Sequence, residues 1–125
     1  MKENNTNKIV NKVTDQNFEA VVTGAKTPVL LHFSAKDDWT RPYLSKFLEK
    51  ISHDYQDRLT VASARLDKNP ELAMIFDVKS VPTVVVMDGA LVAETFEGAN
   101  KPSTYIEKIE QVLALRNNAE ARVAS

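Results

Sequence analysis

The side chains best suited to chemistry stand together in one polar turn, Asp37-Asp38-Trp39-Thr40-Arg41. Two neighbouring carboxylates serve as general acid and base only where their surroundings separate their pKa values, and a solvated turn does not do this. A carboxylate at the start of a helix stabilises that helix by about 0.3–1 kcal/mol. Asp38 and Arg41 are also spaced for an ion pair worth roughly 0.2–0.5 kcal/mol. The pattern therefore favours helix capping by Asp38 over catalysis.

Trp39 is the only tryptophan of the chain and lies in the middle of this turn. Its type and position leave two interpretations open. An exposed ring would be an anchor for a partner, because tryptophan is enriched at the energetic centres of protein interfaces. Alternatively, the ring folds back and packs on the neighbouring loop.

His32 interrupts an otherwise apolar run at residues 29–33. If that run is buried, desolvation disfavours the charged ring and lowers the pKa of His32 below its ordinary value of about 6.5. A proton-transfer role would require both a partner and access to solvent, so a buried, neutral histidine is the favoured interpretation. His32 and His53 have no supporting cluster of ligands, and we expect no metal and no cofactor.

Hydrophobic periodicity predicts the elements that position these residues. The apolar run 29–33 predicts a strand covered on both faces. Apolar residues at helical spacing predict a helix over 38–55, with Pro42 in its first turn, where a missing N–H costs nothing. Residues 59–66 predict a second, parallel strand, and Asn69-Pro70 predicts the start of another helix.

The flanking segments complete a mixed pattern. Thr14 or Asp15 is expected to cap a first helix that contains Phe18. Residues 82–87 and 91–96 predict an antiparallel hairpin, and residues 101–115 a last helix. We therefore expect an α/β domain over residues 10–115, between a disordered tail at 1–9 and a polar tail at 116–125.

Four short segments, in this order and spacing, resemble the thioredoxin family: Phe33-Ser34-Ala35, Asp67-Lys68-Asn69-Pro70, Val81-Pro82-Thr83 and Gly98-Ala99. The resemblance implies a thioredoxin fold, with a mixed central sheet flanked by helices and a cis-proline at Pro82. It also implies that Asp38-Trp39-Thr40-Arg41 stands where the family has Cys-Gly-Pro-Cys. The chain contains no cysteine. Because the thiolate is the nucleophile of thiol–disulfide exchange, we expect a redox-inactive member.

Two further positions depart from the family pattern. His32 stands where the family has a buried aspartate beneath the active site, and Ser63 replaces the lysine that partners this aspartate. Both members of the proton-handling pair are therefore absent together with both thiols. These joint replacements indicate a site that has acquired another role.

The resemblance to cysteine-free domains of this fold implies a binding protein that is not an enzyme. It would act as an accessory, chaperone-like or scaffolding partner of another protein. The expected surface has seven residues, with Asp38 and His32 as secondary candidates: Trp39, Thr40, Arg41, Val81, Pro82, Gly98 and Ala99. An extended segment would pair with the backbone there. One alternative is an enzyme, or enzyme subunit, that uses Asp38, Arg41 or His32 on a small molecule. Another is a structural oligomer.

Charge and composition exclude other kinds of partner. The formal net charge of −1 gives no electrostatic basis for binding nucleic acid or an anionic membrane. No apolar run approaches the roughly 20 residues of a membrane helix. The polar start Met1-Lys2-Glu3-Asn4-Asn5 lacks the apolar core of a signal peptide, so we expect a cytoplasmic protein.

Overall fold

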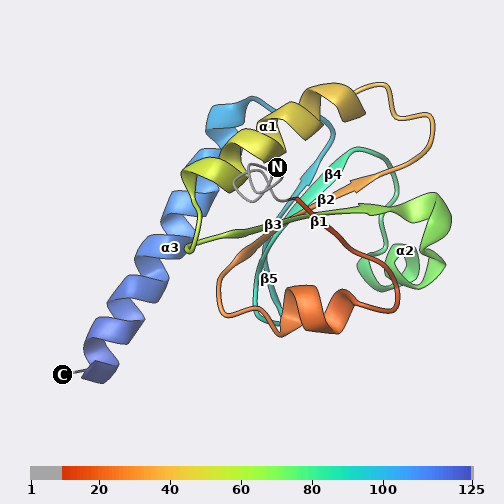
Figure 1. Ribbon diagram of the computed structural model, residues 1–125. Coiled ribbons are helices and arrows are strands. Elements are labelled where there is room, and N and C mark those ends of the chain that lie inside the picture. Colours follow the sequence, from red (N-terminus) through yellow and green to blue (C-terminus); the bar gives the residue numbers. More distant parts are fainter. Residues whose placement is uncertain (1–9, 125) are drawn as a thin grey trace, which may run out of the picture.

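The computed structural model describes residues 10–124, so the tail predicted at 1–9 lies outside the described residues. Its centre is a five-stranded sheet in the order β1-β3-β2-β4-β5 (Figure 1). β3 pairs in parallel with β1 and β2, whereas β4 pairs antiparallel with β2 and β5. The predicted mixed sheet is confirmed. Its strands are β1 (Asn11–Lys12), β2 (Val29–Ser34), β3 (Thr60–Arg65), β4 (Thr83–Asp88) and β5 (Leu91–Glu97).

Helices cover both faces of this sheet (Figure 1). One face packs against α1 (Arg41–Asp54) and α3 (Pro102–Ala124). The other packs against a π-helical turn, η2 (Glu19–Thr23), and against α2 (Pro70–Phe76). A short 3₁₀ turn, η3 (Leu66–Lys68), connects β3 to α2. The result is the three-layer arrangement that the sequence predicts, since each apolar face needs a covering layer.

β2 is the strand that both layers bury, and all six of its residues are buried. Side chains alternate between the two faces of a strand. Leu30 accordingly packs into the core on the α1 and α3 side, while its neighbour Leu31 packs into the core on the α2 side. This two-sided burial explains why the sequence of the strand is almost continuously apolar.

The amino-terminal segment matches the expected capped helix only in part. The Thr14 hydroxyl accepts from the backbone N–H of Asn17 at 3.3 Å, as a cap does, and the N–H of Thr14 donates to the side-chain oxygen of Asn17 at 2.8 Å. The helical segment that follows is only the short π-helical turn η2. Asp15 does not cap this segment. Its carboxylate instead accepts hydrogen bonds from the backbone N–H groups of Leu72, at 3.0 Å, and Glu71, at 3.3 Å. Asp15 therefore caps α2, a helix that lies far along the chain.

The last helix continues beyond its expected end near residue 115. α3 includes Arg116 and runs to Ala124. No glycine or proline interrupts the chain after Pro102. The guanidinium of Arg116 also bonds to the carboxylate of Asp88 at 2.5 Å and to the carbonyl of Lys26 at 2.6 Å. The start of the segment predicted as a polar tail is thus a helical extension tied to the domain.

Candidate functional site

Three segments leave the sheet at the same edge. Phe33 near the end of β2 and Glu97 at the end of β5 both lie opposite Thr83, the first residue of β4. The turn that follows β2, the residues that precede β4 and those that follow β5 must therefore lie close together. The backbone N–H of Gly98 donates to the carbonyl of Pro82 at 2.8 Å, which joins two of the three segments directly.

The 38–41 turn is held by an internal hydrogen-bond pair. One carboxylate oxygen of Asp38 accepts from the backbone N–H of Thr40 at 3.0 Å and from its hydroxyl at 2.5 Å. Both side chains are buried. They shape the turn and do not present their polar groups to solvent, although Thr40 was expected on the recognition surface. The predicted ion pair between Asp38 and Arg41 is absent from the described contacts. The second carboxylate oxygen of Asp38, Oδ2, is buried and has no hydrogen-bond partner among the described residues.

Trp39 points away from the domain. Its side chain is 86% exposed, the largest exposed fraction given for any large hydrophobic residue of the described chain. The ring therefore does not fold back onto the neighbouring loop. Arg41 is half-buried beside it and forms no ion pair with a described residue. The turn thus offers an aromatic ring and an unpaired cation to solvent.

His32 lies in the sheet below this turn and is completely buried. Its Nδ1 lies 3.4 Å from the hydroxyl of Ser63, the residue opposite it on β3, and its Nε2 has no partner among the described residues. Burial lowers the pKa of His32 from 6.5 to about 4, with Asp38 raising it and Arg41 lowering it by their charges. The ring is therefore neutral near pH 7, in agreement with the expectation for a buried histidine.

The second segment of the site contains the cis peptide bond Val81–Pro82. Val81 is half-buried, and no described residue forms a hydrogen bond with its main chain. In the third segment, Gly98 has a φ of 79°, in the left-handed region that favours glycine, and Ala99 is exposed. The N–H and C=O of Val81 are therefore without partners among the described residues, two residues before β4 begins.

Sequence reasoning missed Tyr43, whose side chain is 53% exposed. It lies in the first turn of α1, whereas Trp39 lies in the turn that precedes this helix. The buried stripe of α1 drew attention to Leu44 and Leu48, and Tyr43 does not belong to this stripe. Its aromatic type at a position outside this stripe was the available signal.

Comparison with known proteins decides the family. A family model described as thioredoxin matches residues 9–111. The chain belongs to the thioredoxin family. This thioredoxin-family protein is 35% identical over 95 residues to a thioredoxin of Buchnera aphidicola subsp. Acyrthosiphon pisum (strain APS), with 74% of the chain and 85% of the relative covered. It is 29% identical over 106 residues to a thioredoxin of Griffithsia pacifica, with 83% and 95% covered. A chloroplastic M-type thioredoxin of Chlamydomonas reinhardtii is 30% identical over 103 residues, with 81% and 72% covered.

These relatives contradict the expectation that the protein is not an enzyme. They are named thioredoxin, an oxidoreductase, so family membership gives no ground for excluding catalysis. The absence of cysteine still removes the thiolate that thiol–disulfide exchange requires. The missing cysteines therefore exclude thiol–disulfide exchange by the side chains of this chain. They do not exclude other reactions.

Within residues 10–124, no group of three or more ligand-type side chains is placed to hold a metal ion. No helix in the same range combines the length and the apolar character needed to cross a bilayer.

Proposed function

We propose that the 38–41 turn stands in the place of the family's Cys-Gly-Pro-Cys motif and that the surface around it binds an extended segment of another protein. The protein would serve this partner as an accessory, chaperone-like or scaffolding subunit. The observation that carries the proposal is the exposure of Trp39, which is 86%. A cytoplasmic location stays a prediction of the sequence.

An exposed tryptophan supports a docking role because its large apolar surface gains most from being covered. Tryptophan is prominent among the residues whose truncation costs an interface 2 kcal/mol or more. Arg41 beside it carries an unpaired positive charge, and arginine is likewise enriched in interfaces. Arg41 is the first residue of α1, and Trp39 lies in the hydrogen-bonded turn just before it, so a partner would meet a surface whose backbone is already ordered.

The main chain of Val81 supplies the second part of the proposed surface. Its N–H and C=O are free of described partners, and the residue lies just before β4. An extended segment can pair with such groups as an added strand, so that the backbone supplies affinity and side-chain pockets supply specificity. Gly98, bonded to Pro82, places a residue without a side chain next to this position.

The alternative that the site acts on a small molecule ranks second. It would use Asp38, Arg41 or His32, and membership of a family of oxidoreductases keeps it as a candidate. Against it, His32 is fully buried and Asp38 is 8% exposed, so neither reaches a substrate in solvent without movement of the turn. Arg41 alone among the three has access.

The test uses peptides selected from a random phage-displayed library on the full chain, with the best binder synthesised and titrated. Trp39→Ala should weaken its binding by roughly thirtyfold or more, which corresponds to about 2 kcal/mol. Thermal unfolding should be unchanged, because the removed ring makes little contact with the domain. In NMR spectra of the wild-type chain, the peptide should shift the amide signals of Val81 and Gly98.

Leu91→Ala is the matched control. Leu91 is 72% exposed and lies at the other end of β5, away from the proposed surface. Its truncation should leave both affinity and stability unchanged. If Trp39→Ala binds the peptide as tightly as the wild-type chain, or if the shifted amides lie elsewhere, the proposed surface is wrong.

A further inference from the structure

A half-open cavity lies between α1 and α3, on the outer side of these helices from the sheet. Its volume is about 610 Å³, within the range of roughly 300–1,000 Å³ typical of small-molecule sites. Its apolar lining consists of Tyr43, Phe47, Ile51 and Tyr55 from α1 and its end, and Pro102 and Ile106 from α3. None of these residues belongs to the surface proposed above.

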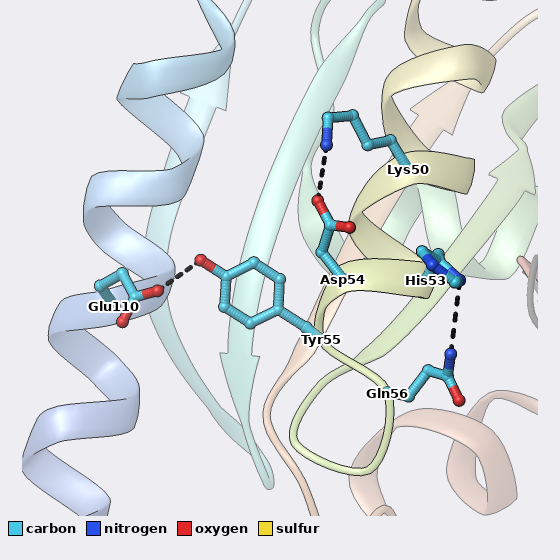
Figure 2. A network of polar contacts seen from close by, with 6 residues as sticks. All are labelled: Lys50, His53, Asp54, Tyr55, Gln56 and Glu110. Atoms are coloured by element: carbon cyan, nitrogen blue, oxygen red, sulfur yellow. Dashed lines mark hydrogen bonds and ion pairs between the residues drawn. The ribbon is translucent and has the colours of Figure 1, made fainter.

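The floor of the cavity is built into the core. Ile51 is 1% exposed and Tyr55 is 7% exposed, and Phe47 packs its ring 5.4 Å from that of Tyr105. Figure 2 shows the ring of Tyr55 reaching from the end of α1 towards α3, where its hydroxyl donates to the carboxylate of Glu110. Burial and this hydrogen bond raise the pKa of Tyr55 to about 12. The floor is thus a largely aromatic and apolar surface, with the carboxylate of Glu110 at the end of the Tyr55 ring that faces α3.

The rim carries an excess of positive charge. Lys46, Lys50 and Asp54 lie four residues apart on one face of α1. Lys50 pairs with Asp54 at 2.7 Å, as Figure 2 shows. Arg58 lies over the ring of Tyr55, 4.9 Å from its centroid.

Two of these cations have no anionic partner within residues 10–124. No carboxylate among the described residues pairs with Lys46 or Arg58, although both side chains line the cavity. The chain as a whole carries a formal net charge of −1. The rim of the cavity is therefore positively charged although the whole chain is slightly negative. A positively charged rim favours a ligand with an anionic group.

We propose that this cavity binds a small amphiphile that has an apolar body and one anionic end, of the chemical class of a fatty-acid carboxylate. The body would lie on Phe47, Ile51 and Ile106, where burial of its apolar surface stabilises the complex. The carboxylate would meet Lys46 or Arg58, the two cations without a carboxylate partner. Lys50 is already neutralised by Asp54.

The experiment titrates laurate, below its micelle concentration, into the full chain by calorimetry. Laurate should bind at a single site, and dodecyltrimethylammonium, which has the same chain length and a positive head group, should bind at least tenfold more weakly. The double variant Lys46→Glu with Arg58→Glu should weaken laurate binding at least tenfold and improve binding of the cationic amphiphile. Laurate should also shift the amide signals of Phe47 and Ile51 in NMR spectra.

The matched control is Lys12→Glu with Lys68→Glu, which makes the same change in net charge at exposed residues outside the cavity. Laurate should bind this control as it binds the wild-type chain. Ile106→Trp, which fills the cavity without changing charge, should abolish binding while the thermal transition is retained. If Ile106→Trp does not fold, the two charge variants decide alone. Absence of laurate binding, equal binding of both amphiphiles, or equal losses in both charge variants would overturn the proposal.

Discussion

His32 is a titratable ring without access to solvent, and this makes the stability of the domain depend on pH. Its pKa is lowered from 6.5 to about 4, chiefly by burial. Between these values the unfolded chain binds the proton more readily than the folded chain does. The contribution of a neutral, buried His32 to stability is therefore fully present above pH 6.5 and is lost as the pH falls towards 4. Below pH 4 this residue causes no further change. The loss amounts to roughly 3 kcal/mol.

The prediction is checked by urea unfolding at a series of pH values for wild type, His32→Asn and His53→Asn. His32→Asn should flatten the stability profile between pH 4 and 6.5, whereas His53→Asn should retain the wild-type slope. His53 is exposed and serves as the matched control. A wild-type slope in the His32→Asn variant would mean that another group titrates in this window.

At the scale of elements, Asp15 acts as a cap supplied from another part of the chain. Its carboxylate accepts from the N–H of Leu72 and that of Glu71 at the start of α2. Removal of a capping side chain costs about 0.5–2 kcal/mol. We expect Asp15→Ala to lower the free energy of unfolding by about 1 kcal/mol, measured by urea denaturation.

Asp37→Ala is the control, because Asp37 is exposed and accepts no hydrogen bond from a described residue. It should change the free energy of unfolding by less than about 0.5 kcal/mol. If Asp15→Ala and Asp37→Ala lowered the free energy of unfolding equally, the hydrogen bonds of Asp15 to α2 would make no contribution beyond that of a negative charge.

The elements that the sequence predicts correctly are those with a strong local pattern. The apolar run of β2 and the Asn69-Pro70 start of α2 are such signals, and both match the structure. β1 has only two residues, too few for any periodicity. The role of Asp15 and the anchoring of Arg116 depend on contacts between residues that are far apart in sequence. Such contacts leave no local pattern.

The candidate site shows the same limit. The family resemblance grouped the turn with Val81 and Gly98, and the observed strand register brings these segments to one edge of the sheet. Exposure could not be anticipated. Trp39 and Thr40 are neighbours in one polar turn, yet one is 86% exposed and the other 5%. The hydrogen bonds between Thr40 and Asp38 decide which side chain turns inward, and they require the folded turn.

At the scale of the whole molecule, the two cores share one sheet and should unfold together. Leu30 and Leu31 are both fully buried but belong to opposite cores. Truncation of a buried leucine to alanine costs about 2–5 kcal/mol. We expect Leu30→Ala and Leu31→Ala each to lower stability by this amount while unfolding stays a single transition.

Urea unfolding followed by circular dichroism and by NMR amide signals from both helical layers provides the measurement. Leu91→Ala, at a residue that is 72% exposed, should stay within about 0.5 kcal/mol of wild type. Signals of one layer that persist after those of the other have disappeared would show that the two cores unfold separately.

The hydrogen bonds between Asp15 and α2 also bear on the order of events in folding. Asp15 and Leu72 are 57 residues apart, and the N–H of Asp15 also donates to Asn69 at 3.0 Å. Closing so long a loop costs more chain entropy than forming a helix or a hairpin, so contacts of this kind tend to form late. A contact made after the transition state affects the unfolding rate and leaves the folding rate nearly unchanged.

Stopped-flow kinetics of Asp15→Ala should therefore show unfolding accelerated by about fivefold per kcal/mol lost, with refolding close to wild type. Refolding slowed by the full factor would instead place this contact in the folding nucleus. On this reasoning the hydrogen bonds between Asp15 and α2 break before the transition state of unfolding, so they prolong the lifetime of the native state.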